Sequence, residues 1–131
     1  MRYPRDLVIE ASTGSLLPGR DNYALTITAD GKGRFIRYRP DDLGPPLEET
    51  TFAVHPDSME VLWSAINDQD FFALEERYVS EDVQDGSFAV LTITAEGRTR
   101  RVEVRNASVP PFDRLIEIIN RSSPPGADLR Y

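Results

Sequence analysis

The stretch from Asp57 to Leu74 constrains the fold most strongly, because it holds the densest set of large apolar side chains in the chain. Its first part repeats apolar residues at i, i+3, i+4 and i+7, the spacing of one helix face (Met59, Leu62, Trp63 and Ile66). Pro56 precedes this repeat, and the side chains of Asp57 and Ser58 can accept hydrogen bonds from the first free backbone N–H groups. The sequence therefore predicts a helix that buries one apolar stripe.

Length and charge limit the class of protein. A chain of 131 residues suffices for one domain with a real core, and without cysteine it forms no disulfide bond. The net charge of −7 argues against nucleic acid and against an anionic membrane surface as partners. No apolar run reaches the ~20 residues of a membrane span, and the N-terminus lacks the apolar segment of a signal peptide. We expect a single domain over residues 1–131, located in the cytoplasm, or outside it if the chain is a mature form.

The first of two predicted β-hairpins covers residues 23–38 and has Asp30-Gly31 at its turn. A two-residue turn there pairs Leu25 with Ile36. This register predicts a mostly apolar inner face (Tyr23, Leu25, Ile27, Ile36 and Tyr38). It turns Phe35 and Arg37 toward the other face. A slip of one residue would exchange the two faces.

The second hairpin covers residues 87–105, turns at Glu96-Gly97 and pairs Leu91 with Val102. Residues 7–11 and 50–54 are rich in β-branched side chains and read as further strands. A second helix after Ser108 repeats the apolar stripe of the first (Phe112, Leu115, Ile116 and Ile119). We expect residues 122–131 to form a short tail.

These elements predict an α+β domain of two layers in the order β-ββ-β-α-ββ-α. Its antiparallel sheet would have five to six strands, made of the two hairpins and one or two further strands, packed on two helices. Residues 25–31 and 91–97 match at six of seven positions, and each hairpin precedes a helix. Internal duplication and convergence of two threonine-rich hairpins both explain this match.

The sequence shows no catalytic constellation. His55 is the single histidine and stands before a proline, so it has no second histidine or cysteine as partner. Acidic pairs occur in polar segments (Asp41-Asp42, Glu48-Glu49, Glu75-Glu76 and Glu81-Asp82). Nothing in the sequence around them indicates the burial that acid–base work requires. We therefore predict that the protein is not an enzyme and has no cofactor and no metal site.

Arginine supplies fourteen of the fifteen basic residues, and many arginines fall on the return strands of the two hairpins. Under the predicted registers, five side chains form an outward face (Phe35, Arg37, Arg39, Arg101 and Arg105). Arginine and aromatic residues are enriched at protein interfaces, so this face is the predicted binding site for another protein. The alternative is an ordinary solvated sheet face with cross-strand pairs.

Several segments together resemble a family of small bacterial domains of unknown function, often found on exported proteins or lipoproteins. They are Tyr23-Ala-Leu-Thr-Ile, Asp30-Gly, Asp70-Phe-Phe-Ala-Leu with Tyr78, and the Leu91-Thr-Ile hairpin. The resemblance covers roughly residues 20–121. The family's Cys-Pro-x-Tyr start is replaced here by Arg20-Asp21-Asn22-Tyr23, so anything that depends on that cysteine is absent. The resemblance implies no activity and favours a place outside the cytoplasm.

Two functional hypotheses follow from the sequence. The first is a non-catalytic domain that binds another protein, as an accessory subunit of a larger bacterial assembly. The second is a small-ligand-binding domain or a minor enzyme that uses loop carboxylates and His55. The sequence specifies neither the partner or ligand nor the oligomeric state.

Overall fold

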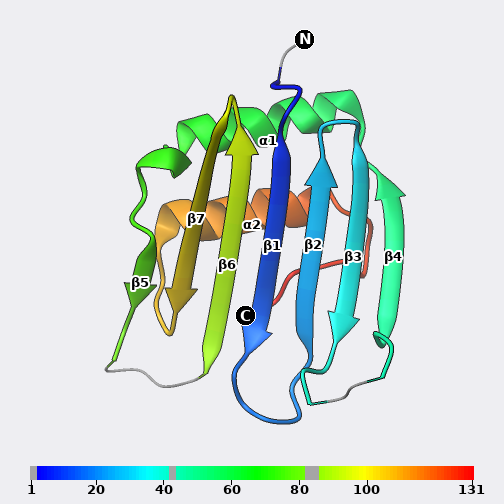
Figure 1. Ribbon diagram of the computed structural model, residues 1–131, viewed down its shortest axis with the longest axis vertical. Coiled ribbons are helices and arrows are strands. Elements are labelled where there is room, and N and C mark those ends of the chain that lie inside the picture. Colours follow the sequence, from blue (N-terminus) through cyan, green and yellow to red (C-terminus); the bar gives the residue numbers. More distant parts are fainter. Residues whose placement is uncertain (1–2, 42–43, 82–85) are drawn as a thin grey trace.

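The computed structural model describes residues 3–41, 44–81 and 86–131, and over these ranges it is one sheet with two helices on a single face (Figure 1). The strand order in these ranges is β4-β3-β2-β1-β6-β7-β5. The strands are β1 (Val8–Ser15), β2 (Asn22–Thr28), β3 (Lys32–Tyr38), β4 (Glu48–Ala53), β5 (Arg77–Val79), β6 (Ser87–Ala95) and β7 (Arg98–Arg105). The helices are α1 (Pro56–Asp68) and α2 (Pro110–Arg121), with a short 3₁₀ turn at Phe71–Ala73.

The predicted α+β class is confirmed, but the sheet differs in size from the prediction. The described part of the chain has seven strands rather than five to six. The additional strand is β5, which runs parallel to β7, so the sheet is mixed rather than wholly antiparallel. None of the helices in the described ranges is long and apolar enough to cross a membrane.

Strand β1 is the centre of the sheet and is longer than the predicted segment 7–11. It pairs antiparallel with both β2 and β6, so that Ile9 stands opposite Ile27 on one side and Ile93 on the other. All three isoleucines are fully buried. A strand that is paired on both sides and covered by helices favours such β-branched side chains.

The predicted register of the first hairpin is wrong by one residue. Leu25 pairs with Phe35, not with Ile36, because the strands are joined by three residues, 29–31, rather than two. Gly31 has φ +83°, its N–H donates to the carbonyl of Thr28, and the Asp30 side chain accepts a hydrogen bond from the Lys32 amide. Phe35 is therefore buried on the helix side, and Ile36 points the other way.

The predicted register of the second hairpin is confirmed, with Leu91 opposite Val102 and Ala89 opposite Val104. Both residues of its turn have positive φ, +55° at Glu96 and +76° at Gly97. This conformation is typical of a two-residue hairpin turn, whose twist matches that of the strands.

Both helices bury the stripes that the sequence predicts, apart from Trp63, which is only partly buried. The buried positions are Met59, Leu62 and Ile66 on α1 and Phe112, Leu115, Ile116 and Ile119 on α2. They share one core with the inward side chains of the sheet. The cap of α1 is not Asp57 or Ser58: His55 precedes the helix, and its Nδ1 accepts a hydrogen bond from the Asp57 amide at 3.1 Å.

The C-terminal segment, predicted as a short tail, packs onto the domain. Ala127 and Leu129 are 2% and 3% exposed and belong to the core. The Asn120 side chain accepts from the Leu129 amide at 2.9 Å and donates to the Leu129 carbonyl at 3.1 Å. The next amide, that of Arg130, donates to the hydroxyl of Thr13 on β1. These contacts fix the segment against β1 on the side of the sheet that the helices cover (Figure 1).

The N-terminal segment is fixed to the β6–β7 turn by Asp6. Its carboxylate accepts hydrogen bonds from the Gly97 and Glu96 amides, both at 2.8 Å. These bonds, first Gly97 and then Glu96, lower the pKa of Asp6 below its usual 3.8. The native state therefore binds fewer protons here than the unfolded chain. The stabilisation is present above pH 3.8 and is lost as the pH falls through the lowered pKa.

We expect Asp6→Asn to lower the free energy of unfolding at pH 7 and to weaken its dependence on pH below 4. Asparagine retains one acceptor oxygen but places an amide donor against the second backbone N–H. Urea unfolding between pH 7 and pH 2 measures both effects, and Asp68→Asn, at an exposed position of α1, is the control. If the free energy of unfolding of Asp6→Asn depended on pH as that of the wild type does, the Asp6 carboxylate would not contribute to the pH dependence of stability.

Candidate functional site

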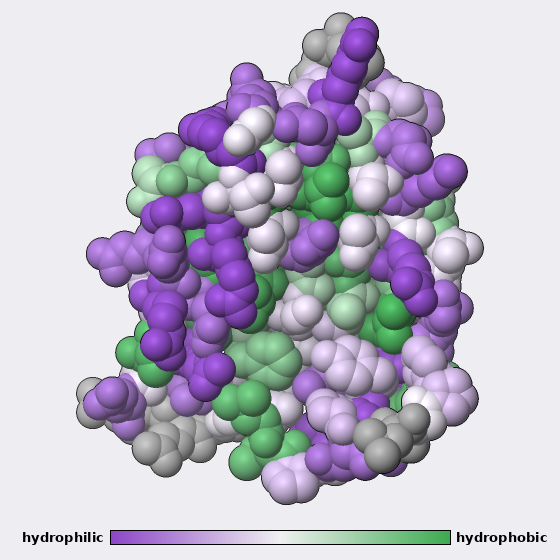
Figure 2. Space-filling view, in the orientation of Figure 1, coloured by the Kyte–Doolittle hydropathy of each residue, from purple (hydrophilic) through white to green (hydrophobic). Residues whose placement is uncertain are grey.

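One face of the sheet carries no helix, and we call it the free sheet face. It is the face toward the viewer in Figure 1, where both helices lie behind the strands. Its side chains come from alternate residues of each strand: Val8, Glu10 and Ser12; Ala24, Thr26 and Thr28; Lys32, Arg34, Ile36 and Tyr38; Glu49 and Thr51; Phe88, Val90, Thr92 and Thr94; Thr99, Arg101, Glu103 and Arg105. Figure 2 shows this face with pale residues over its middle and strongly hydrophilic ones over β7 and β5.

Three of the five predicted interface residues, Phe35, Arg37 and Arg39, are not on this face. Phe35 is 0% exposed in the core, where its ring stacks on that of Tyr23 with centroids 6.0 Å apart. Arg37 follows Phe35 at the next inward position, opposite Tyr23. Its guanidinium pairs with Asp21 at 2.9 Å and with Glu48 at 3.3 Å, which raises its pKa above the usual value. Both corrections follow from the three-residue turn that shifts the register of β3.

Arg39 lies just beyond the end of β3 and does not belong to the free sheet face. Its Nε donates to Asp21 at 2.9 Å. Asp21 thus receives one arginine from β3 and one from beyond it. The hydrogen bonds from Arg39 and then Arg37 hold the pKa of Asp21 below its usual range.

Arg101 and Arg105 do lie on the free sheet face, as predicted from the second hairpin, and both pair with Glu103 between them. The Glu103 side chain is only 9% exposed, whereas those of Arg101 and Arg105 are 57% and 42% exposed. Arg77 on β5 stands beside Glu103 in the parallel pair. We call Arg77, Arg101, Glu103 and Arg105 the β7 arginine cluster. The buried carboxylate holds two of its three arginines at the surface.

The residues of the alternative hypothesis do not converge on one site. His55 is 72% exposed and caps α1 through its ring nitrogen. Glu48 and Glu49 lie on opposite faces of β4 and pair with Arg37 and Arg34. The other acidic pairs fall partly outside the described residues (Asp42 and Asp82) or pair with arginine, as Glu76 does with Arg100 at 3.7 Å. Among the described residues, no group of three or more His, Cys, Asp or Glu side chains could hold a metal ion.

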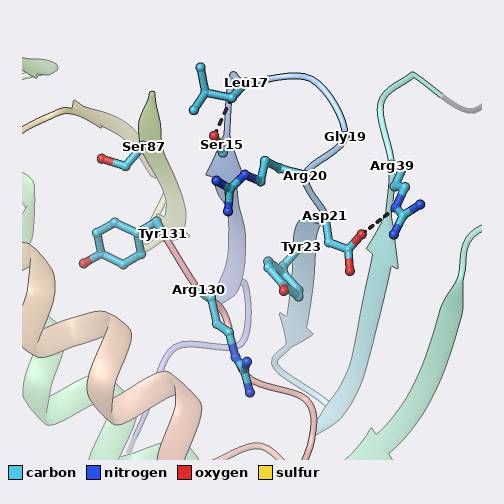
Figure 3. Close-up of a pocket in the computed structure, with 11 residues that line it drawn as sticks. Ser15, Leu17, Gly19, Arg20, Asp21, Tyr23, Arg39, Ser87, Arg130 and Tyr131 are labelled. Carbon is cyan, nitrogen blue, oxygen red and sulfur yellow. Dashed lines mark hydrogen bonds and ion pairs between the residues drawn. The ribbon is translucent and has the colours of Figure 1, made fainter. Parts of the chain in front are cut away.

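A pocket that the sequence did not predict lies where the β1–β2 connection meets the C-terminal segment (Figure 3). Its volume is about 560 Å³, within the ~300–1,000 Å³ usual for ligand sites. It is lined by Gly14, Ser15, Leu17, Gly19, Arg20, Asp21, Tyr23, Arg39, Ser87, Arg130 and Tyr131. We call it the Arg20–Arg130 pocket. Its residues come from both ends of the chain, so no local motif could indicate it.

Hydrogen bonds within the β1–β2 connection shape one wall of this pocket. The Asn22 side chain accepts from the Ser15 amide at 3.0 Å, and the Ser15 hydroxyl accepts from the Leu17 amide at 3.1 Å. Gly14 leaves the space that Asn22 needs, because a Cβ there would lie 2.2 Å from the Asn22 Oδ1. The opposite wall ends in Tyr131, whose hydroxyl donates to Asp113 and whose ring meets Phe112 edge-on. Burial and this hydrogen bond raise the pKa of Tyr131.

The comparisons with known proteins add no family to this description. A scan against protein-family models finds no match, and a search of curated proteins finds no significant match. The resemblance to small exported bacterial domains therefore stays a prediction.

Proposed function

We propose that the protein is a non-catalytic binding domain that docks another protein on its free sheet face, as an accessory subunit of a larger bacterial assembly. The observation that carries this proposal is the one-sided fold: both helices of the described chain cover one face of the sheet, and the other face is open (Figure 1).

The free sheet face is large enough for a stable interface. Six strand spacings of about 4.8 Å and seven residues of about 3.3 Å give a surface of roughly 29 Å by 23 Å. This area approaches the ~800 Å² that each partner buries in a typical protein complex. The middle of the face carries small or β-branched side chains, such as Ala24, Thr26 and Val90.

The charge of the β7 arginine cluster indicates an acidic partner surface. Three arginines surround one glutamate there, although the whole chain has a net charge of −7. Glu103 is nearly buried, so the charges that a partner meets are mainly positive. Arginine is enriched among the few residues that carry most of the binding energy of protein interfaces. Complementary charges mainly raise the association rate and the specificity.

We expect the double variant Arg77→Glu, Arg101→Glu to stay folded and to lose its protein partner. Both side chains are exposed, and Glu103 keeps its ion pair with Arg105. The reversed charges would repel an acidic counter-surface. The measurement is affinity capture from the native cells with the wild type and the variant as baits, followed by mass spectrometry, with circular dichroism to verify folding.

The matched control is Arg114→Glu, Arg121→Glu on α2, which reverses two exposed arginines that also flank a glutamate, Glu117. The proposal expects a stoichiometric protein that the control retains and the sheet-face variant loses. Capture of the same proteins by all three baits, or of none by the wild type, would contradict it.

A further inference from the structure

The Arg20–Arg130 pocket holds two arginines without a carboxylate partner in the described part of the chain. Arg20 comes from the β1–β2 connection and Arg130 from the C-terminal segment. Figure 3 shows Arg20 between Tyr131 and Tyr23, and the Arg130 side chain extending away from Arg20. The chain has 22 acidic residues against 15 basic ones, so unpaired arginines are not the result of a shortage of carboxylates.

The acidic residue in the pocket does not neutralise these arginines. Asp21 lines the same pocket but is engaged by Arg37 and Arg39, at 2.9 Å in each case, and is only 22% exposed. The lining therefore combines three arginines, Arg20, Arg39 and Arg130, with one aspartate that is already paired. The net formal charge of these side chains is three minus one, or +2.

The backbone that carries these arginines is fixed before any ligand arrives. The Arg130 amide donates to the Thr13 hydroxyl at 3.1 Å, and the preceding residue is held by both polar atoms of the Asn120 side chain. On the other wall, the Gly19 amide donates to Asp41 at 3.1 Å next to Arg20. A fixed site loses less conformational entropy on binding than a mobile one.

We propose that the Arg20–Arg130 pocket binds a small organic oxyanion, a carboxylate or a phosphate, at the unpaired guanidinium group of Arg20, with Arg130 adding positive charge to the same pocket. A guanidinium presents paired N–H donors that match the oxygen atoms of both groups. Tyr23, Tyr131 and Leu17 supply apolar surface for the organic part of the ligand. This site lies at one end of the sheet and is separate from the β7 arginine cluster, so it does not rest on the proposed protein interface.

The test is isothermal titration of the full chain at low ionic strength with inorganic phosphate, phenyl phosphate and benzoate. The proposal expects phenyl phosphate or benzoate to bind with one-to-one stoichiometry and more tightly than inorganic phosphate, because the ring adds contact with the tyrosines. The stronger of the two aromatic probes distinguishes a phosphate site from a carboxylate site. Amide chemical shifts of Gly14, Gly19 and Ser87 should respond to the same titration, since these residues line the pocket.

Arg20→Gln, Arg130→Gln should weaken binding by roughly a hundredfold, because each charge-assisted hydrogen bond contributes about tenfold or more. The control Arg5→Gln, Arg121→Gln removes the same charge at two exposed positions elsewhere and should bind as the wild type does. Lack of binding of both aromatic probes to the wild type would overturn the proposal, as would an equal loss in both double variants. The sheet-face variant Arg77→Glu, Arg101→Glu should retain binding, which separates this site from the protein interface.

Discussion

Phe35→Ala is expected to lower the free energy of unfolding by about 3–5 kcal/mol, the usual range for removing a buried aromatic ring. Phe35 is fully buried in the middle of β3, opposite Leu25 and Thr50, and its ring stacks on Tyr23. The substitution would leave a cavity that sheet and helices cannot close, because both are held by their own hydrogen bonds. Urea denaturation followed by circular dichroism measures the loss.

The neighbouring substitution Ile36→Ala is the control for this experiment. Ile36 lies on the free sheet face and is only partly buried, so its loss should cost roughly 1 kcal/mol, in proportion to the smaller apolar area removed from water. The two-residue turn that the sequence suggests would reverse the order of these two effects. A larger loss at Ile36 than at Phe35 would therefore contradict the register of β3.

The register of the first hairpin could not be read from the sequence because the turns of the two hairpins look alike. Asp30-Gly31 and Glu96-Gly97 are both an acidic residue followed by glycine. In the second turn both residues adopt positive φ, whereas in the first only Gly31 does, and Asp30 instead accepts a hydrogen bond from the Lys32 amide. Periodicity could not decide either, since the adjacent Phe35 and Ile36 offer an apolar side chain to the core in either register.

Local patterns predicted the elements whose stability depends on one apolar stripe, namely both helices and the second hairpin. They did not predict features that depend on distant parts of the chain. Strand β5 pairs through only three residues, and the C-terminal segment is held by Asn120 and Thr13. The Arg20–Arg130 pocket is lined by residues from both ends of the chain. The sequence around an arginine in a polar segment does not indicate whether the side chain has a carboxylate partner.

The similarity of residues 25–31 and 91–97 reflects a shared position rather than a superposable repeat. β2 and β6 flank β1 at equivalent registers, with Leu25 and Leu91 both opposite Ala11. Their partner strands β3 and β7 lie on opposite sides of β1. A rotation that superposes the β2–β3 hairpin on the β6–β7 hairpin would turn the side chain of Leu25 away from the helices. In the structure, Leu25 and Leu91 are both buried in the same core. Two strands beside one central strand need the same alternation of apolar and threonine side chains.

Leu62→Ala and Leu115→Ala are each expected to lower the free energy of unfolding by about 2–5 kcal/mol. Leu62 on α1 and Leu115 on α2 are both 2% exposed and belong to the core that joins the helical layer to the sheet. At roughly 3 °C per kcal/mol for a domain of this size, each melting temperature should fall by about 6 °C or more. Thermal unfolding followed by circular dichroism measures the shift, and Val61→Ala, at a position 56% exposed on α1, should change it little. Melting near the wild-type temperature in both leucine variants would mean that the helices contact the sheet through other faces, and a larger effect at Val61 than at Leu62 would identify that face on α1.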